Sequence, residues 1–310
     1  MISLGARITR AILRAYTYPY RKNHKSLSRS IKFKNKPYRP PKNCNYEVAN
    51  INGTSVEILT PANSNSNACI VQFHGGGHTQ AMNGMYRKAA ERLCNLTNCA
   101  VYSIDYKIGN ELVYPSIHNE CYSAYVGLCN DRLRDKCIIA IGDSFGANLM
   151  LSTCLKLHDE NNSLPRGLIC ISSYIDLAAT GDSYKKNCYR DPLYSLPKNQ
   201  CFECNEQFIR RKTPYCGETS PFNKLLSPAY AEYYDFPNML IQCGEYETSA
   251  SDSDMLYLKA KSAGVNATFT EYSGMWHDFQ YLTPFLKESK NAWKEIGQFI
   301  KSYIDSPCKS

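Results

Sequence analysis

The chain has 310 residues, of which 43% are hydrophobic and 21% charged, so it can bury the core of one large domain or two smaller ones. No stretch approaches the ~20 consecutive apolar residues that a membrane-spanning helix needs. Arginines at Arg7, Arg10 and Arg14 interrupt the apolar run that a signal peptide would require, so we expect a soluble, cytoplasmic protein.

The net charge of +8 is unevenly distributed along the chain. Residues 1–42 hold twelve Lys/Arg and no Asp/Glu, a charge of +12, whereas the remainder has 24 basic and 28 acidic residues, a charge of −4. Five apolar residues of this segment recur at helical spacing: Leu4, Ile8, Ala11, Ile12 and Ala15.

These features predict an amphipathic helix in a basic N-terminal segment, residues 1–44. The simplest interpretation places this helix on the domain with its basic face in solvent. The second interpretation is weak contact between residues 1–42 and an anionic membrane surface. Nucleic-acid binding is not expected, because no recognised nucleic-acid module follows the segment.

After the basic segment, strand-like and helix-like stretches alternate. Residues 46–50 and 54–59 flank Asn52-Gly53, a pair that predicts a β-hairpin with a type I′ turn. The expected strands that follow are 69–73, 100–106, 137–141, 167–173, 239–243 and 267–272. The expected helices are 85–94, 116–128, 147–158, 252–263 and 291–304. The pattern predicts an α/β fold, with a mostly parallel sheet and helices on both of its faces.

Residues 180–226 interrupt this alternation and are rich in Tyr, Pro, Cys and Lys. We interpret them as an insertion over the carboxyl edge of the sheet, where sites of such folds lie. Cys201, Cys204 and Cys216 could be three zinc ligands, but no second C-x-x-C or H-x-x-H follows, so we expect reduced thiols and no metal. Several of the 15 cysteines fall in predicted core elements, which suits a reducing compartment.

Residues 142–146 read Gly-Asp-Ser-Phe-Gly and lie between a predicted strand and a predicted helix. In that context a G-x-S-x-G motif forms a sharp turn that raises the serine hydroxyl above the edge of the sheet. A serine hydroxyl becomes a good nucleophile when a neighbouring base removes its proton. Ser144 is therefore the candidate nucleophile.

The candidate base is His277, in a loop between the last predicted strand and the last helix. Its tautomer has to be fixed by a carboxylate on a loop that follows a late strand. Glu247, three residues beyond Gly244 at the end of such a strand, is the first candidate, and Asp252 is the alternative. Asp278, the sequence neighbour of His277, is expected to point elsewhere.

A third motif, His74-Gly75-Gly76-Gly77-His78, directly follows the strand predicted at 69–73. Consecutive glycines allow backbone amides to approach a ligand closely, as the oxyanion of an acyl-transfer intermediate requires. The motif is of the HGGG type that forms the oxyanion hole of esterases and lipases.

Taken together, these motifs resemble those of the hormone-sensitive-lipase family of α/β-hydrolases, in its bacterial carboxylesterase branch. Residues 74–77 are similar to the family's oxyanion motif, 105–111 to its Asp-Tyr-Arg-Leu-Ala-Pro-Glu segment, and 142–149 to its Gly-Asp-Ser-Ala-Gly-Gly-Asn-Leu elbow. The resemblance covers about residues 45–305. It implies that Ser144, Glu247 and His277 form a triad, and that the amides of Gly76, Gly77 and Phe145 form the oxyanion hole, with His74 and Gly75 supporting the loop.

The same resemblance implies a catalytic domain at 45–310, with residues 1–44 and the insertion at 180–226 contributing to a cap. It implies a cofactor-free serine esterase for small short-acyl or aryl esters, whose acyl-chain preference and oligomeric state the sequence leaves open. An amide hydrolase of the arylformamidase kind and a silent ligand-binding receptor of the same fold are the alternatives. The chain departs from the family where Glu247 replaces Asp and Phe145 replaces a small residue.

Overall fold

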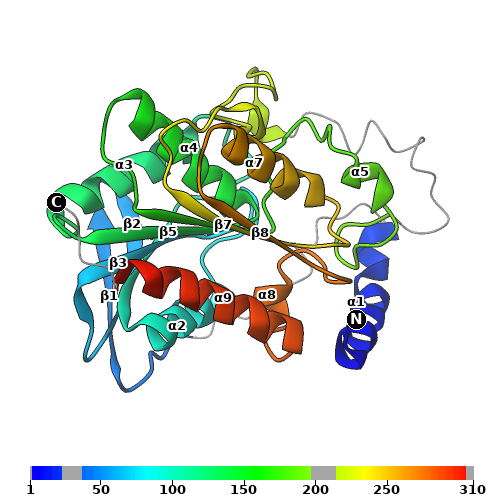
Figure 1. Ribbon diagram of the computed structural model, residues 1–310, viewed down its shortest axis with the longest axis horizontal. Coiled ribbons are helices and arrows are strands. Elements are labelled where there is room, and N and C mark those ends of the chain that lie inside the picture. The colour runs from blue at the N-terminus through cyan, green and yellow to red at the C-terminus, as the bar shows by residue number, and fades with distance from the viewer. Residues whose placement is uncertain (1, 23–36, 197–213, 305–310) are drawn as a thin grey trace.

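The computed structural model describes residues 2–22, 37–196 and 214–304, and its centre is one eight-stranded sheet (Figure 1). Across the sheet the strands lie in the order β1 (Cys44–Ile51), β2 (Thr54–Pro61), β4 (Cys99–Asp105), β3 (Asn65–Phe73), β5 (Cys137–Asp143), β6 (Gly167–Ile171), β7 (Asn238–Gly244) and β8 (Ala267–Tyr272). The pairs β1–β2 and β2–β4 are antiparallel, and the other neighbours are parallel. The predicted α/β fold with a mostly parallel sheet is confirmed.

The hairpin at the N-terminal edge of the sheet forms around the predicted turn. Ile51 pairs with Thr54, and the two turn residues both have positive φ, 49° at Asn52 and 87° at Gly53. A type I′ turn needs positive φ at both central positions, which asparagine and glycine adopt most readily. The turn residues therefore set the register of β1 on β2.

Helices cover both faces of the sheet (Figure 1). One face carries α3 (Ser116–Asp131), α4 (Phe145–Asp159) and α7 (Ala250–Ser262), and the other carries α2 (Gly84–Thr97), α8 (Phe279–Leu282) and α9 (Lys287–Ile304). Successive side chains of a strand enter opposite cores: in β5, Ile138 and Ala140 belong to the first, Ile139 and Ile141 to the second. Each fully buried isoleucine contributes about 1.5–3 kcal/mol relative to exposure.

The C-terminal helices differ from the prediction in two respects. The last helix begins at Lys287, before the predicted Asn291, and the short helix α8 was not predicted. Four residues are too few for a periodic pattern to be visible, and α8 is held instead by contacts such as the bond that the Trp293 indole N–H donates to the Gln280 carbonyl, 2.9 Å long.

The described parts of the insertion at 180–226 contain α5 (Ser183–Lys186) and η2 (Pro214–Cys216), and η3 (Pro228–Tyr230) follows. Cys201 and Cys204 lie outside the described residues, and Cys216 is buried. Within residues 2–22, 37–196 and 214–304, no group of three or more His, Cys, Asp or Glu side chains is arranged to hold a metal ion.

The N-terminal helix α1 (Leu4–Lys22) forms, but the prediction that its basic face lies in solvent holds for Arg7 and is wrong for Arg14. Arg14 and Arg21 donate to backbone carbonyls in the segment 189–196, while Leu4, Ile8 and Ile12 are exposed. The helix takes this orientation because the guanidinium groups donate hydrogen bonds to carbonyl groups of the domain. Aliphatic side chains have no donors and would leave those carbonyl groups without partners. No described helix, α1 included, is both long and apolar enough to span a bilayer.

Candidate active site

The turn between β5 and α4 places Ser144 at the carboxyl edge of the sheet. Its φ of 51° and ψ of −123° are strained values for a residue with a side chain. The flanking glycines make the turn possible, because a Cβ on Gly142 would lie 2.6 Å from the carbonyl oxygen of Gly146. The Ser144 amide donates to the carbonyl of Ile171 on the neighbouring β6, at 2.9 Å, and this bond holds the turn against the sheet.

Loops that follow three different strands bring Ser144, His277 and Glu247 together. The Ser144 hydroxyl donates to His277 Nε2 at 2.9 Å, and His277 Nδ1–H donates to Glu247 Oε2 at 3.3 Å. All three residues are buried. The serine follows β5, the glutamate β7 and the histidine β8, and the carboxyl ends of these parallel strands meet at one edge of the sheet.

Glu247 is oriented by hydrogen bonds to both of its carboxylate oxygens. While Oε2 faces the histidine, Oε1 accepts from the Ser172 hydroxyl at 2.8 Å and from the backbone amide of Gly244. Ser172 also accepts a bond from the Asp278 amide at 3.0 Å, so one hydroxyl links the loop of the acid to the loop of the base. The longer glutamate side chain is thus fully satisfied in this position.

Asp252, the alternative acid, makes no contact with His277. It lies in the first turn of α7, where its Oδ2 accepts from the amides of Ile175 and Asp176 at 2.8 and 2.9 Å. Those bonds tie α7 to the loop that follows β6. Of the two predicted acids, the structure brings only Glu247 to the histidine.

The glycine loop after β3 lies against the turn that carries Ser144, because the Gly75 amide donates to the side chain of Asp143. Gly76 and Gly77 have φ values of 89° and 62°, a backbone conformation that residues with side chains rarely adopt. Successive amides in such a turn can form a concave site for an anion. Among the described residues, no hydrogen bond engages the amides of Gly76 and Gly77. Phe145 is the first residue of α4, and the first amides of a helix have no intrahelical acceptor.

Two side chains hold the glycine loop in place. The Tyr106 hydroxyl donates to the carbonyl of His74 at 2.8 Å, and its ring stacks on the His74 ring at 4.2 Å. Asp143, the residue before the nucleophile, accepts from the Gly75 amide at 3.1 Å. Burial lowers the pKa of His74 to about 4, so this histidine is neutral and acts as a packing group near neutral pH.

Asp278 does not point away from His277, so the expectation for this residue is wrong. Its φ of 51° turns the side chain back, and Oδ2 lies 3.3 Å from His277 Nε2, the nitrogen that also faces Ser144. Its other oxygen, Oδ1, is buried and has no hydrogen-bond partner among the described residues. The sequence offered no signal for this, because the left-handed backbone at Asp278 depends on its packing.

Further groups that the sequence did not reveal surround the imidazole. Asp191 is buried, accepts from the Leu193 amide at 2.7 Å, and belongs to the segment that also places the Tyr194 ring edge-on to His277 at 5.0 Å. Burial lowers the pKa of His277, but the charges of Asp278, Glu247 and Asp191 outweigh that effect and raise it. Burial raises the pKa of Asp278, while the histidine opposes the rise.

We expect Asp278→Asn to shift the acidic limb of the kcat/KM pH profile toward lower pH by about one unit or more. A general base has to be neutral, and a raised pKa keeps His277 protonated until higher pH. Removing one negative charge lowers that pKa, so the variant becomes active at more acidic pH. Initial rates at low substrate concentration, measured between pH 5 and 10, report this limb. The control variant Asp254→Asn removes an exposed carboxylate on α7 and should leave the acidic limb at its wild-type pH. An unshifted limb in Asp278→Asn would contradict the conclusion that Asp278 raises the pKa of His277.

The bulk of Phe145 is accommodated by an aromatic cluster. Its side chain is buried and contacts the rings of His118 and Tyr215 at 5.9 and 5.5 Å. His118 is itself hydrogen-bonded to the Tyr215 hydroxyl at 2.8 Å and to Asn148 at 3.0 Å. Tyr215 comes from the insertion at 180–226, so this cluster fastens the insertion to the serine turn.

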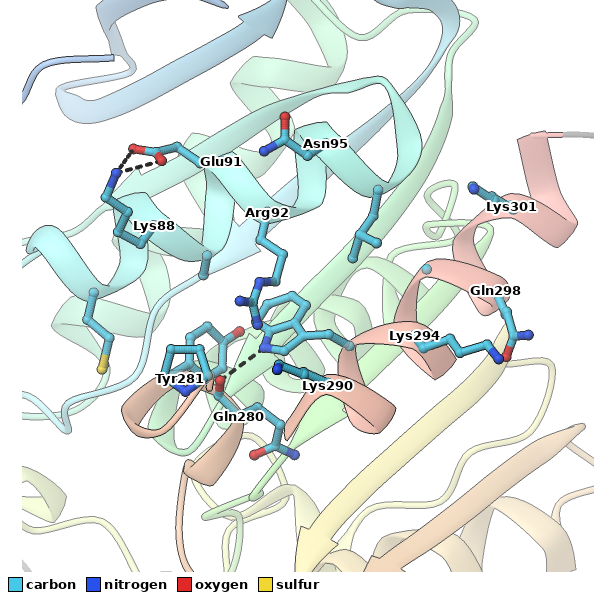
Figure 2. A pocket seen from close by; sticks show the side chains of 16 residues that line it. Lys88, Glu91, Arg92, Asn95, Gln280, Tyr281, Lys290, Lys294, Gln298 and Lys301 are labelled. Atoms are coloured by element: carbon cyan, nitrogen blue, oxygen red, sulfur yellow. Dashed lines mark hydrogen bonds and ion pairs between the residues drawn. The ribbon is translucent and has the colours of Figure 1, made fainter. Parts of the chain in front are cut away.

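A cavity of about 840 Å³ lies between α2, α8 and α9, and none of the residues assembled around Ser144 lines it (Figure 2). Arg92 lies over the Trp293 ring at 5.3 Å. Lysines of α2 and α9 also line the cavity (Figure 2). The Lys88 ammonium pairs with Glu91 at 2.7 Å. This cavity is separate from the site at the carboxyl edge of the sheet.

Comparison with known proteins shows that this chain has many relatives. A family model described as the alpha/beta hydrolase fold matches residues 70–281. An esterase of Acinetobacter venetianus is 29% identical over 82% of this chain and 80% of its own. A putative acetyl-hydrolase of Mycobacterium tuberculosis is 25% identical over 86% of this chain and 83% of its own.

Solved structures agree with the family model. The crystal structure of an esterase from the bacterial hormone-sensitive lipase family is 25% identical, superposes with a TM-score of 0.79, and covers 98% of this chain and 99% of its own. An esterase/lipase from an uncultured bacterium has a TM-score of 0.82 at 21% identity over 98% of this chain and all of its own, a likeness of fold.

Proposed function

This chain belongs to the alpha/beta hydrolase fold family, in its hormone-sensitive-lipase branch, and on that premise we propose that it is a serine carboxylesterase. The observation that carries the proposal is the unbroken hydrogen-bond chain from Ser144 through His277 to Glu247. A hydroxyl bonded to an imidazole that is itself bonded to a buried carboxylate is the arrangement that activates a serine nucleophile. The relatives named esterase, acetyl-hydrolase and arylesterase support the same reaction class.

In the proposed mechanism, Ser144 Oγ attacks the ester carbonyl while His277 Nε2 takes the hydroxyl proton. The amides of Gly76, Gly77 and Phe145 hold the negative oxygen of the tetrahedral intermediate. The intermediate collapses as His277 gives its proton to the leaving alcohol, which leaves an acyl-serine. Water then attacks the acyl carbon, His277 takes its proton, and the carboxylic acid departs as the hydroxyl of Ser144 re-forms. No cofactor enters these steps.

Within this proposal, residues 45–310 form the catalytic domain, and residues 1–44 with the insertion at 180–226 form a cap. The support comes from Tyr194, whose ring contacts His277, and from the bonds between α1 and residues 189–196. Among the described residues no disulfide joins two cysteines, and most cysteines are buried, which favours a reducing, cytoplasmic environment.

The proposed function is tested with p-nitrophenyl acetate and butyrate beside the matched p-nitroanilides. We expect turnover of the esters and little turnover of the anilides. The C–N bond of an anilide breaks only when its nitrogen is protonated, which makes the amine a poorer leaving group than p-nitrophenol. Faster hydrolysis of the anilides would instead support an amidase of the arylformamidase kind. A fluorophosphonate probe should label Ser144. Failure of both turnover and labelling would favour a ligand-binding receptor of the same fold.

A further inference from the structure

An apolar surface runs along the solvent side of α1. Leu4, Ile8 and Ile12 are 73%, 53% and 62% exposed, and Ala11 and Ala15 between them are exposed as well. We call these five residues the outer stripe. Their spacing places them on one face of the helix, over a length of about 17 Å at 1.5 Å per residue. A row of large apolar side chains in solvent is unusual on a protein surface and indicates a binding surface.

The fold prevents the outer stripe from turning inward, because the opposite face of α1 is fastened at both ends. The Ser3 amide and hydroxyl bond the carboxylate of Glu288 on α9 at 2.8 and 3.0 Å. Further along the helix, Arg10 lies over the Tyr246 ring at 4.5 Å, and Arg21 donates to the Ser195 carbonyl at 3.4 Å. Rotating α1 to bury the outer stripe would break all of these contacts.

The net charge of the N-terminal segment identifies the partner. The stripe belongs to a segment, residues 1–42, with twelve basic residues and no acidic one. Arg7 is exposed beside the stripe. A second copy of the chain seated on the stripe would bring two such positive segments together, which like-charge repulsion opposes. A bilayer that contains anionic lipid matches both the apolar stripe and the positive charge.

We propose that the outer stripe of α1 binds the surface of anionic bilayers, with the helix lying in the plane of the interface. Leu4, Ile8 and Ile12 enter the boundary between headgroups and acyl chains, and the exposed Arg7 contacts lipid phosphates. Since Arg10 on the inner side of α1 contacts Tyr246, the neighbour of Glu247, the bound bilayer lies on the side of the molecule that adjoins the proposed active site. Binding does not depend on the proposed esterase reaction.

Sedimentation of the full-length protein with vesicles tests this proposal. We expect the wild type to bind vesicles of phosphatidylcholine mixed with phosphatidylglycerol, to bind phosphatidylcholine alone weakly, and to be released by high salt. The double variant Ile8→Ser/Ile12→Ser should lower the partition coefficient at least about tenfold, because two aliphatic side chains no longer leave water. Both residues are exposed, so the variant should fold and keep its turnover of soluble p-nitrophenyl acetate.

A matched control is Leu258→Ser, which removes a leucine that is 58% exposed on α7 and should leave vesicle binding unchanged. Ser144→Ala should also bind as the wild type does, which separates this proposal from the proposed function. The proposal is overturned if the wild type does not bind anionic vesicles, or if the double variant binds them equally. It is also overturned if light scattering finds a dimer that the double variant dissociates, since the stripe would then be an interface between copies.

Discussion

Replacing Ser144 with alanine should lower kcat for p-nitrophenyl acetate by about 10⁴-fold or more, while the protein remains folded. The variant lacks the oxygen that attacks the carbonyl, so no acyl-enzyme can form and only weak catalysis by the oxyanion loop remains. The Ser144 hydroxyl donates one hydrogen bond, to His277, and its side chain is small. Its loss therefore removes the reaction with little effect on packing. Steady-state rates over a range of substrate concentrations measure the effect.

Two measurements make this result specific to Ser144. Thermal unfolding should give similar midpoints for wild type and variant, and labelling by a fluorophosphonate probe should disappear. Ser262→Ala, at an exposed serine of α7, should change neither rate nor labelling. Ester turnover at the wild-type level by Ser144→Ala would exclude the acyl-serine mechanism.

Glu247→Gln should lower kcat by about 10³- to 10⁴-fold with a smaller effect on KM. Glu247 accepts the Nδ1–H bond of His277 and is the only carboxylate at that nitrogen among the described residues. Glutamine keeps the shape of the side chain but removes the charge that stabilises the imidazolium. It can also present its amide to the ring and so favour the wrong tautomer. Single-turnover rates with p-nitrophenyl acetate separate this effect from product release.

The control for this prediction is Asp252→Asn, the alternative acid. Asp252 accepts hydrogen bonds from the amides of Ile175 and Asp176 and makes no contact with the imidazole. The kcat of this variant should therefore stay within about tenfold of the wild-type value. Its unfolding temperature should fall, because an amide-accepting group in the core is altered. If Asp252→Asn abolished turnover and Glu247→Gln did not, the assignment of the acid would have to be reversed.

Ser172 joins the loop that carries Glu247 to the loop that carries His277. Its hydroxyl donates to Glu247 and accepts from the amide of Asp278, so it fixes the distance between the acid and the turn that carries the histidine. Its own φ of 47° is set by the bond of its amide to the Gln242 carbonyl on β7, 2.7 Å long. A serine after a strand has no motif of its own, which is why the sequence did not single it out.

The amino-acid sequence by itself determined the elements and their order. The apolar run of β5, the glycines on both sides of Ser144 and the Asn52-Gly53 turn each constrain a few neighbouring residues, and local constraints of that kind are readable from the chain. The order of the serine, acid and histidine motifs sufficed to propose a site, because parallel strands deliver the loops at their carboxyl ends to one edge. The family resemblance rested on the same short motifs.

What only the tertiary structure decided depends on contacts between residues far apart in the chain. Glu247 and Asp252 are both acidic residues just after β7, and their different hydrogen-bond partners separate their roles. Glu247 accepts from Ser172 and Gly244. Asp252 accepts from the amides of Ile175 and Asp176. The left-handed backbone conformation of Asp278 also depends on contacts between residues far apart in the chain. The period of α1 was predictable, since 3.6 residues per turn governs it, but its orientation was not. That orientation follows from the acceptors that residues 189–196 offer to Arg14 and Arg21, and these leave the outer stripe in solvent.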